Sequence, residues 1–294
     1  MLPVIAPVVA PHAVTGLDPA HLVVADVRWY LDGRDGRAAF ELSHIAGAVW
    51  VDLDHALAAH GLPATEGRHP FPTPEVFAAE MGQLGIGDES VVVAYDDTGG
   101  LTAGRLVVML RMLGRQAAVL DGGLEAWVTA GLPTRTGAAA VATPNTFTAT
   151  PWPDDRLATG DQALVLAAAG GAVIDARPLA RFTGENDLID PRPGHIPGAR
   201  SAPWSSVLSA AGELLTPEEL RAHYACLGIT DADTPSIAYC GSGVSACMNI
   251  VAMEHAGLTP SRLYVASWSG WSSDPARRVE LGTSEVGTSQ VGQP

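Results

Sequence analysis

The chain of 294 residues is 47% apolar and 17% charged, a composition typical of one or two globular domains with a sizeable core. All 17 basic residues are arginines, which excludes a pyridoxal-type Schiff base and a P-loop lysine, and we expect no metal site and no cofactor. The net charge of −15 argues against nucleic acid and anionic membranes as partners, so local arginines must hold any anionic substrate.

The chain contains three cysteines, Cys226, Cys240 and Cys247, and no pair of them has metal-binding or Cys-x-x-Cys spacing. A small, odd number of cysteines suits a reducing compartment better than a disulfide-linked scaffold. Met1 to Ala10 is apolar but contains two prolines and no basic residue, so we expect a leading strand or arm there and not a signal peptide. These features together predict a cytoplasmic protein.

Short apolar runs alternate with helical stretches along the whole chain. The first half has such runs at residues 21–27, 48–53, 90–95 and 117–120. The second half has them at residues 172–175, 199–202, 236–239 and 262–265. This alternation predicts an α/β fold in which each mainly parallel sheet has helices on both faces.

Three stretches of the first half recur in the second half. Residues 23–28 resemble 173–177, residues 44–48 resemble 195–199, and residues 92–95 resemble 236–239. Offsets of 144 to 151 residues indicate a duplicated domain and not a solenoid repeat. Because His44 and His195 recur in both halves, we expect them to have structural roles.

The composition between the two halves predicts where the domains end. We expect a first domain over residues 1–135 and a second over residues 158–282. Residues 136–157 are rich in Pro, Thr and Ala and are predicted to form an extended linker. Residues 283–294 are rich in Gly, Ser and Thr and are predicted to form a flexible tail.

The second half places a cysteine where a strand ends. Cys240 follows the apolar run 236–239, and a glycine-flanked loop then leads into a helical stretch from residue 246. Consecutive backbone N–H groups in such a loop can form an anion-binding nest, and the helix dipole adds positive charge at the same point. Both effects favour thiolate over thiol, so the loop predicts a nucleophilic sulfur.

The same loop argues against a cysteine phosphatase. A phosphatase loop of similar design carries an arginine six residues after the cysteine, where it grips the phosphate. Ala246 occupies that position here. The anion that the loop binds is therefore predicted not to be a transferring phosphate.

The loop from Cys240 to Ala246 resembles the active-site loop of the rhodanese superfamily, closest to its mercaptopyruvate sulfurtransferase branch. The position equivalent to Cys240 in the first half is Asp96, which cannot carry a sulfane sulfur. An inactive first half followed by a cysteine-bearing second half is similar to two-domain sulfurtransferases. The resemblance implies a tandem duplication of a rhodanese-like domain, of which only the second has the nucleophile.

The resemblance also implies the residues of the active site. Cys240 would attack the donor sulfur and become a persulfide, while Ser242 would relay a proton to the departing enolate. Asp54 and His69 match polar site residues of the family's first domain. The residues expected to bind the donor are Arg181 and Arg192, as a clamp for its carboxylate and keto oxygen, together with the loop residues Gly241, Gly243, Val244 and Ser245.

The function implied is transfer of a sulfane sulfur from 3-mercaptopyruvate, a small anionic donor, to cyanide or to a thiol such as thioredoxin or a low-molecular-weight thiol. Thiosulfate is the alternative donor, although that branch usually has basic residues just after the cysteine and this loop has none. A non-enzymatic persulfide carrier or regulatory module is the alternative of another class. A carrier has no need of a clamp for a small molecule.

Two further expectations concern residues near the site. Cys226 lies in a helical stretch, residues 216–227, and is expected in the core. Arg105 is expected to be a structural partner of Asp96 or Asp26.

Overall fold

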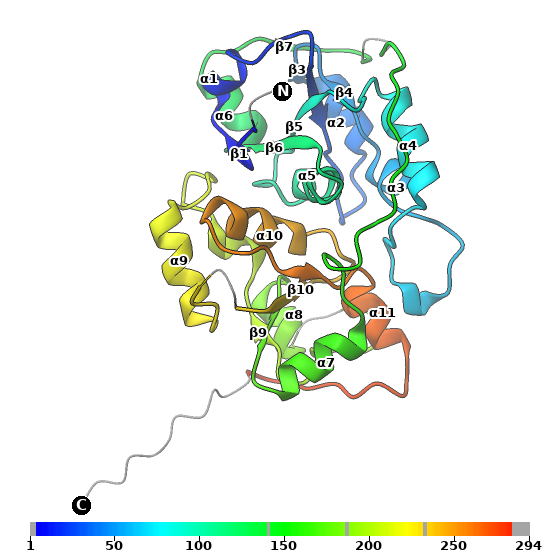
Figure 1. Cartoon of the computed structure of the whole chain (residues 1–294), viewed down its shortest axis with the longest axis vertical. Helices are drawn as coiled ribbons and strands as arrows, with labels where there is room; N and C mark the ends of the chain where they lie inside the picture. Colours follow the sequence, from blue (N-terminus) through cyan, green and yellow to red (C-terminus); the bar gives the residue numbers. More distant parts are fainter. Residues whose placement is uncertain (1–3, 140–141, 186–187, 232–233, 284–294) are drawn as a thin grey trace, which may run out of the picture.

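The protein forms two α/β domains that lie one above the other in Figure 1. The structure is a computed structural model and describes residues 4–139, 142–185, 188–231 and 234–283. Each domain has its own parallel sheet with helices on both faces. The predicted duplication of an α/β domain is therefore confirmed.

The sheet of the first domain has the strand order β1-β6-β5-β2-β4, and every neighbouring pair is parallel. Its strands are β1 (Val8–Val9), β2 (Leu22–Asp26), β4 (Val49–Trp50), β5 (Val91–Tyr95) and β6 (Gln116–Leu120). Two short strands outside this sheet, β3 (His44–Ile45) and β7 (Thr134–Arg135), pair in antiparallel fashion. The whole of β5 is buried, as a central strand covered on both faces requires.

The helices of the first domain divide between the two faces of this sheet. The buried side chains of α3 (Leu53–Ala56), α4 (Pro74–Gln83) and α5 (Ala103–Met112) share one core with Val92 and Ala94 of β5. The buried side chains of α1 (Pro11–Val14), α2 (Gly36–Leu42) and α6 (Gly123–Thr129) share another with Val91, Val93 and Tyr95. Successive residues of β5 thus point into different cores, since strand side chains alternate.

The second domain repeats this arrangement with the strand order β11-β10-β8-β9, again all parallel. Its strands are β8 (Ala172–Asp175), β9 (Arg200–Ser201), β10 (Ser236–Tyr239) and β11 (Arg262–Leu263). Helices α7 (Gly160–Ala168), α8 (Leu179–Thr183) and α11 (Ser267–Ser273) contribute to one core, and α9 (Pro217–Cys226) and α10 (Ala246–His255) to the other. The runs predicted at 172–175 and 236–239 coincide with β8 and β10, whereas β9 and β11 are shorter than predicted because each pairs over only two residues.

The recurring histidines have the same surroundings in both domains. The Nδ1 atom of His44 lies 2.9 Å from the carbonyl oxygen of Phe40, and the two rings are stacked. The Nδ1 atom of His195 lies 2.8 Å from the carbonyl oxygen of Phe182, with the same stacking. Each histidine therefore fixes the turn into the next strand, which is the structural role expected of it.

The segment between the domains packs against the first domain. Residues 142–153 contain no helix or strand, and their trace runs beside α4 in Figure 1. The ring of Phe147 meets Phe77 edge-on, and the indole N–H of Trp152 donates to the carbonyl oxygen of Pro72 at 2.8 Å. The predicted linker is thus anchored by aromatic side chains. The tail predicted at 283–294 lies, apart from Thr283, outside the described residues.

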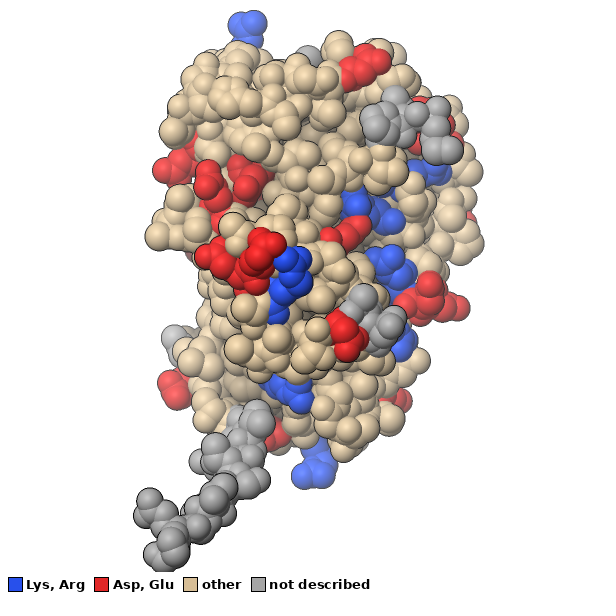
Figure 2. Space-filling view, turned by 60° about the vertical axis from the view of Figure 1, so that its left-hand side comes forward, with Lys and Arg blue, Asp and Glu red and all other residues tan. Residues whose placement is uncertain are grey.

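Within the described ranges, no helix combines the length and the apolar character needed to cross a bilayer. Figure 2 shows one face of the molecule, where arginines are interspersed with carboxylates and separated by uncharged residues. The charge on this face is therefore mixed, although the chain as a whole is acidic.

The two domains meet where α5 lies against α10 (Figure 1). Gly104 in α5 and Met248 in α10 occupy equivalent positions of the duplication, 144 residues apart. A Cβ atom at Gly104 would lie 3.2 Å from the backbone nitrogen of Met248. The absence of a side chain at Gly104 lets the two helix backbones approach, and this approach sets the distance between the domains.

We therefore expect Gly104→Val to lower the free energy of unfolding by about 1–3 kcal/mol, because the added methyl groups must push α5 from α10. Urea unfolding followed by circular dichroism measures this loss. The matched control is Ala38→Val on the exposed face of α2, which adds a β-branched side chain without a helix contact and should cost less than ~1 kcal/mol. Equal losses in both variants would contradict the close-packing argument.

Candidate active site

Cys240 lies at the end of β10, where the chain turns into the loop before α10. Its side chain points into a cavity, although the residue is only 1% exposed. The backbone N–H of Gly243 donates to the Cys240 sulfur at 3.1 Å. Gly243 has a φ of +76°, and a Cβ atom there would lie 2.6 Å from the carbonyl oxygen of Val265. Only glycine fits this turn without strain.

The backbone of Cys240 is held by the beginning of α11. Its N–H donates to Ser267 Oγ at 3.1 Å, and the same hydroxyl donates to the carbonyl oxygen of Tyr264. The carbonyl oxygen of Cys240 accepts from the backbone N–H of Trp268 at 2.9 Å. Ser267 has a φ of +54°, which is uncommon for a residue other than glycine and costs conformational energy. Ser267 was not predicted from the sequence, because no local pattern indicates this conformation.

The equivalent loop of the first domain binds an anion of its own. The Asp96 carboxylate accepts hydrogen bonds of 2.8–3.0 Å from the hydroxyl of Thr102 and from the backbone N–H groups of Thr98, Gly100, Thr102 and Ala103. In the second domain the positions of Thr98 and Gly100 are Ser242 and Val244. Their N–H groups donate to no acceptor in the described part of the chain. The first loop is filled by its own carboxylate, and the second leaves donors for an anion next to Cys240.

A hydrogen-bonded chain crosses from the first domain to the Cys240 loop. Ser242 Oγ lies 2.8 Å from Nδ1 of His69, and Nε2 of His69 lies 3.0 Å from Oδ1 of Asp54. The indole N–H of Trp29 donates to Oδ2 of Asp54 at 2.8 Å. Because Asp54 can only accept, Nε2 carries the proton and Nδ1 accepts from the Ser242 hydroxyl. The structure thus brings together three residues that the resemblance selected.

The protonation states within this chain follow from burial. Burial lowers the pKa of His69, an effect that its hydrogen bond to Asp54 only partly offsets. The hydrogen bond from His69 lowers the pKa of Asp54 despite partial burial of that carboxylate. We therefore assign a neutral imidazole that can take up a proton from Ser242, held in one tautomer by an ionised carboxylate.

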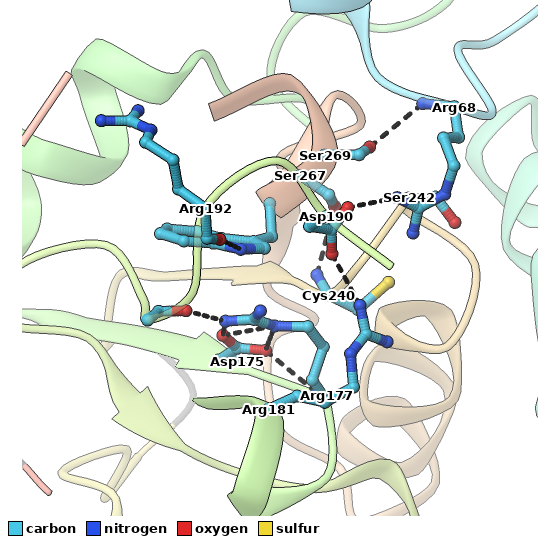
Figure 3. A network of polar contacts seen from close by, with 12 residues as sticks. Arg68, Asp175, Arg177, Arg181, Asp190, Arg192, Cys240, Ser242, Ser267 and Ser269 are labelled. Carbon is cyan, nitrogen blue, oxygen red and sulfur yellow. Dashed lines mark hydrogen bonds and ion pairs between the residues drawn. The ribbon is translucent and has the colours of Figure 1, made fainter. Parts of the chain in front are cut away.

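Two guanidinium groups stand beside the loop, as Figure 3 shows. Arg181 on α8 donates to Oδ2 of Asp190 at 2.6 Å, and Arg68 of the first domain donates to Oδ1 of the same carboxylate. Both arginines line the cavity together with Cys240 and Gly241. Arg181 was predicted, whereas Arg68 was not, because nothing near it in the sequence marks it as more than a surface arginine next to His69.

Arg192, the other arginine predicted to bind the donor, lies outside this cavity. In Figure 3 its side chain extends away from Cys240, and it does not line the cavity. Its guanidinium instead donates at 2.6–3.2 Å to the backbone carbonyl oxygens of Trp271, Ser272, Asp274 and Arg277. The geometry does not support the predicted donor clamp by Arg192, because these contacts hold the end of α11 and the segment after it.

The cavity has a volume of about 360 Å³ and is lined by residues of both domains. The loop contributes Gly241, Ser242, Val244 and Ser245, whereas Gly243 turns behind the wall towards Val265. Much of the remaining surface is apolar, with Trp29, Leu101 and Trp204 among its residues. The cavity therefore combines charged side chains with a largely apolar lining, and Arg68 and Arg181 lie next to the residue that follows Cys240.

Arg105 is a fully buried arginine of the first domain that supports this loop from behind. It donates to the carbonyl oxygens of Gly243 at 2.9 Å, Leu57 at 3.0 Å and His69 at 2.8 Å. Burial lowers the pKa of Arg105 to about 10, which leaves it charged at neutral pH. Its expected pairing with Asp96 or Asp26 is wrong, because Asp96 binds its own loop and Asp26 pairs with Arg28.

The other two cysteines, Cys226 and Cys247, differ in their exposure to solvent. Cys226, expected in the core, is exposed at the end of α9. Cys247 is buried on α10, and its thiol donates to the carbonyl oxygen of Gly243 at 3.3 Å. Burial raises the pKa of the Cys247 thiol to about 12, so this cysteine stays protonated. The environment of Cys247 therefore does not suit a nucleophile at neutral pH.

The lowered pKa of His69 predicts a pH dependence of stability. The unfolded imidazole protonates near pH 6.5 and the folded one at lower pH, so the stability that neutral His69 contributes is complete above about pH 6.5 and is lost as the pH falls. We expect His69→Gln to reduce the loss of unfolding free energy between about pH 6.5 and pH 5. Urea unfolding at several pH values tests this, and identical slopes for the two proteins would contradict it.

Comparison with known proteins identifies the domain type of both halves. A model of the rhodanese-like domain matches residues 16–130 and again residues 159–274. A Pseudomonas aeruginosa protein provisionally named a 3-mercaptopyruvate sulfurtransferase is 38% identical, covering 90% of this chain and 94% of its own. A Mycobacterium tuberculosis protein provisionally named the thiosulfate sulfurtransferase SseB is 39% identical, covering 90% and 92%.

Solved structures lead to the same family. The crystal structure of SseA from Escherichia coli, titled as a 3-mercaptopyruvate sulfotransferase, superposes with a TM-score of 0.78 and 31% identity. The superposition covers 90% of this chain and 99% of that one. The chain therefore belongs to the rhodanese-like family, as a sulfurtransferase built from two rhodanese-like domains.

Proposed function

We propose that the protein moves a sulfane sulfur from 3-mercaptopyruvate to a thiol or to cyanide through a persulfide on Cys240. The observation that carries this proposal is the hydrogen-bonded chain from Asp54 through His69 to Ser242, two residues from the nucleophile. A donor whose leaving group is carbon needs a proton at that carbon, and such a chain can supply one.

The first step forms the persulfide. The Cys240 thiolate attacks the donor sulfur, an S–S bond forms, and the C–S bond breaks with its electron pair going to the enolate of pyruvate. The thiol of the donor loses one proton and the enolate gains one. A neutral base that takes up a proton and returns it therefore balances the step, and His69 acting through Ser242 fits that role.

The second step returns the enzyme to its starting state. A thiolate or cyanide attacks the outer sulfur, and the bond to Cys240 breaks with its electron pair returning to the Cys240 thiolate. Low-molecular-weight thiols and thioredoxin are the acceptors that we propose. The described cysteines are all free thiols, which suits the reducing conditions of the cytoplasm.

We infer the donor from this hydrogen-bonded chain and not from the composition of the Cys240 loop. The loop has no basic residue, yet the guanidinium groups of Arg68 and Arg181 stand over Gly241. Positive charge near the sulfur would suit thiosulfate as well, and the relatives include proteins named for each donor. Sulfite, however, leaves thiosulfate without needing a proton. A steady-state comparison of kcat/KM for the two donors decides between them, and a preference for thiosulfate would overturn the mercaptopyruvate assignment.

A persulfide on Cys240 predicts which cysteine carries sulfur. We expect Cys240→Ser to abolish transfer, because serine is neither ionised at neutral pH nor able to hold a sulfane sulfur. Cys226→Ser should keep most activity, and donor treatment of the wild type should add one sulfur to the intact mass. Peptide mapping locates that sulfur. Label on Cys226 or Cys247 would contradict the mechanism.

The proton transfer predicts that the two donors respond differently to loss of the Ser242 hydroxyl. We expect Ser242→Ala to lower kcat/KM for mercaptopyruvate roughly 100-fold, as loss of a general acid–base group typically does, and to change thiosulfate turnover less than about threefold. His69→Gln should give the same pattern. The control is Ser205→Ala, which removes an exposed hydroxyl and should leave both donors unaffected. Equal losses of kcat/KM for both donors would mean that Ser242 stabilises the loop and does not transfer a proton.

A further inference from the structure

Among the described residues, no carboxylate forms an ion pair with the fully buried cation of Arg105 on α5. Its Nη atoms donate to three backbone carbonyl oxygens, and its guanidinium carbon lies 4.2 Å from the centre of the Phe71 ring. Its Nε atom is buried and has no hydrogen-bond partner in the described ranges. Because carbonyl dipoles and a ring face replace water around a charge only in part, burying this cation costs stability.

The Cys240 loop of the second domain lies against this guanidinium. Nη1 of Arg105 donates to the carbonyl oxygen of Gly243 at 2.9 Å, while the N–H of Gly243 donates to the Cys240 sulfur at 3.1 Å. The thiol of Cys247 donates to the same carbonyl oxygen at 3.3 Å. A single glycine therefore links the buried cation to the nucleophilic sulfur, and both of its backbone polar groups take part in the link.

The negative charge that can balance Arg105 belongs to a cysteine. Burial lowers the pKa of Arg105 to about 10, and the charges that Cys247 and Cys240 carry as thiolates oppose this effect. Burial raises the pKa of Cys247 to about 12, so Cys247 is uncharged at neutral pH. Cys240 is therefore the sulfur that can be an anion next to Arg105. Because the attraction between two charges is mutual, a cation that a thiolate stabilises also stabilises that thiolate.

The duplication supplies a comparison for this placement of charge. The position equivalent to Arg105 is Asn249 in α10, 144 residues later. Asn249 is also fully buried, but it is neutral, and its amide donates within its own domain to the carbonyl oxygen of Ala202. Asp96, which stands in place of the cysteine, instead accepts hydrogen bonds from the N–H groups of its own loop. Of these two equivalent positions, only the one that contacts the cysteine loop carries a cation.

We propose that Arg105 is a positioning residue for the nucleophile, whose buried charge in the first domain stabilises the Cys240 thiolate across Gly243. This proposal rests on the proposed nucleophilic role of Cys240. The same charge acts again when cyanide attacks the outer sulfur of the persulfide: a C–S bond forms, the S–S bond breaks, and its electron pair returns to Cys240. A cation that stabilises this leaving thiolate accelerates the step. If Arg105 only satisfied three carbonyl oxygens, neither effect would be expected.

The ultraviolet absorbance of the thiolate measures this effect without sulfur transfer. The absorbance of each protein at neutral pH is compared with that of the same protein carrying Cys240→Ser, so that the difference reports one cysteine. We expect Arg105→Met and Arg105→Gln each to lower the thiolate fraction of Cys240, and with it the rate of alkylation by uncharged iodoacetamide, roughly tenfold. Arg105→Lys, which keeps a positive charge, should retain most of both. The control is Arg111→Met on the same helix, whose charge is paired with Glu254, and it should keep the wild-type values.

The neutral and charged variants separate charge from hydrogen bonding. A wild-type thiolate signal in Arg105→Gln would overturn the proposal, because hydrogen-bond donors without charge would then suffice. A signal in Arg105→Lys as low as that in Arg105→Met would overturn it as well. If Arg105→Met loses the circular dichroism of the wild type, Arg105→Gln, which keeps an amide donor, replaces it in the same measurements.

The second half of the reaction tests the leaving thiolate directly. The persulfide is loaded with whichever of the two donors the wild type uses, and the release of thiocyanate is followed after mixing with cyanide. Arg105→Met should lower this rate constant roughly tenfold, whereas Arg111→Met should leave it unchanged. A lowered thiolate signal in Arg105→Met would support the proposal even if the wild type turned over neither donor. An unchanged signal would overturn it even if the wild type transfers sulfur.

Discussion

The active site depends on a loop whose backbone N–H groups require an anion. The duplication presents this requirement twice. In the first domain the carboxylate of Asp96 satisfies it internally, with four backbone N–H groups and one hydroxyl as donors. In the second domain Cys240 takes that position, and its sulfur receives the N–H of Gly243. The equivalent position therefore holds a carboxylate that fills its own loop in the first domain and a cysteine that faces the cavity in the second.

The second constraint is that neither domain contains the whole site. Cys240, Ser242 and Arg181 belong to the second domain, while Asp54 and His69 belong to the first. The close approach of α5 and α10 at Gly104 brings these groups within hydrogen-bonding distance. Arg105 fixes the same boundary, because a single guanidinium holds the carbonyl oxygens of both Gly243 and His69. The first domain, which has Asp96 in place of the cysteine, therefore contributes Asp54 and His69 to the hydrogen-bonded chain beside Cys240.

The net negative charge of the chain would repel an anionic ligand, and arginines near the cavity counter this repulsion locally. The chain carries a net charge of −15, yet most arginines near the cavity are matched by a carboxylate of their own. Arg68 and Arg181 both donate to the carboxylate of Asp190. Their guanidinium groups stand over Gly241 and place positive charge beside Cys240 without a basic residue in the loop.

The sequence alone predicted the duplication, the parallel sheets and the position of Cys240 at the end of a strand, because periodicity and repeated segments are local and strong signals. The resemblance selected Ser242, His69, Asp54 and Arg181, which the structure brings to one place. Only the tertiary structure revealed that Arg68 faces the cavity and that Arg192 holds backbone carbonyls. The direction in which a long side chain points depends on packing between segments far apart in the chain, here η1 (Ala64–Glu66) against α11, and no pattern within one segment records that packing.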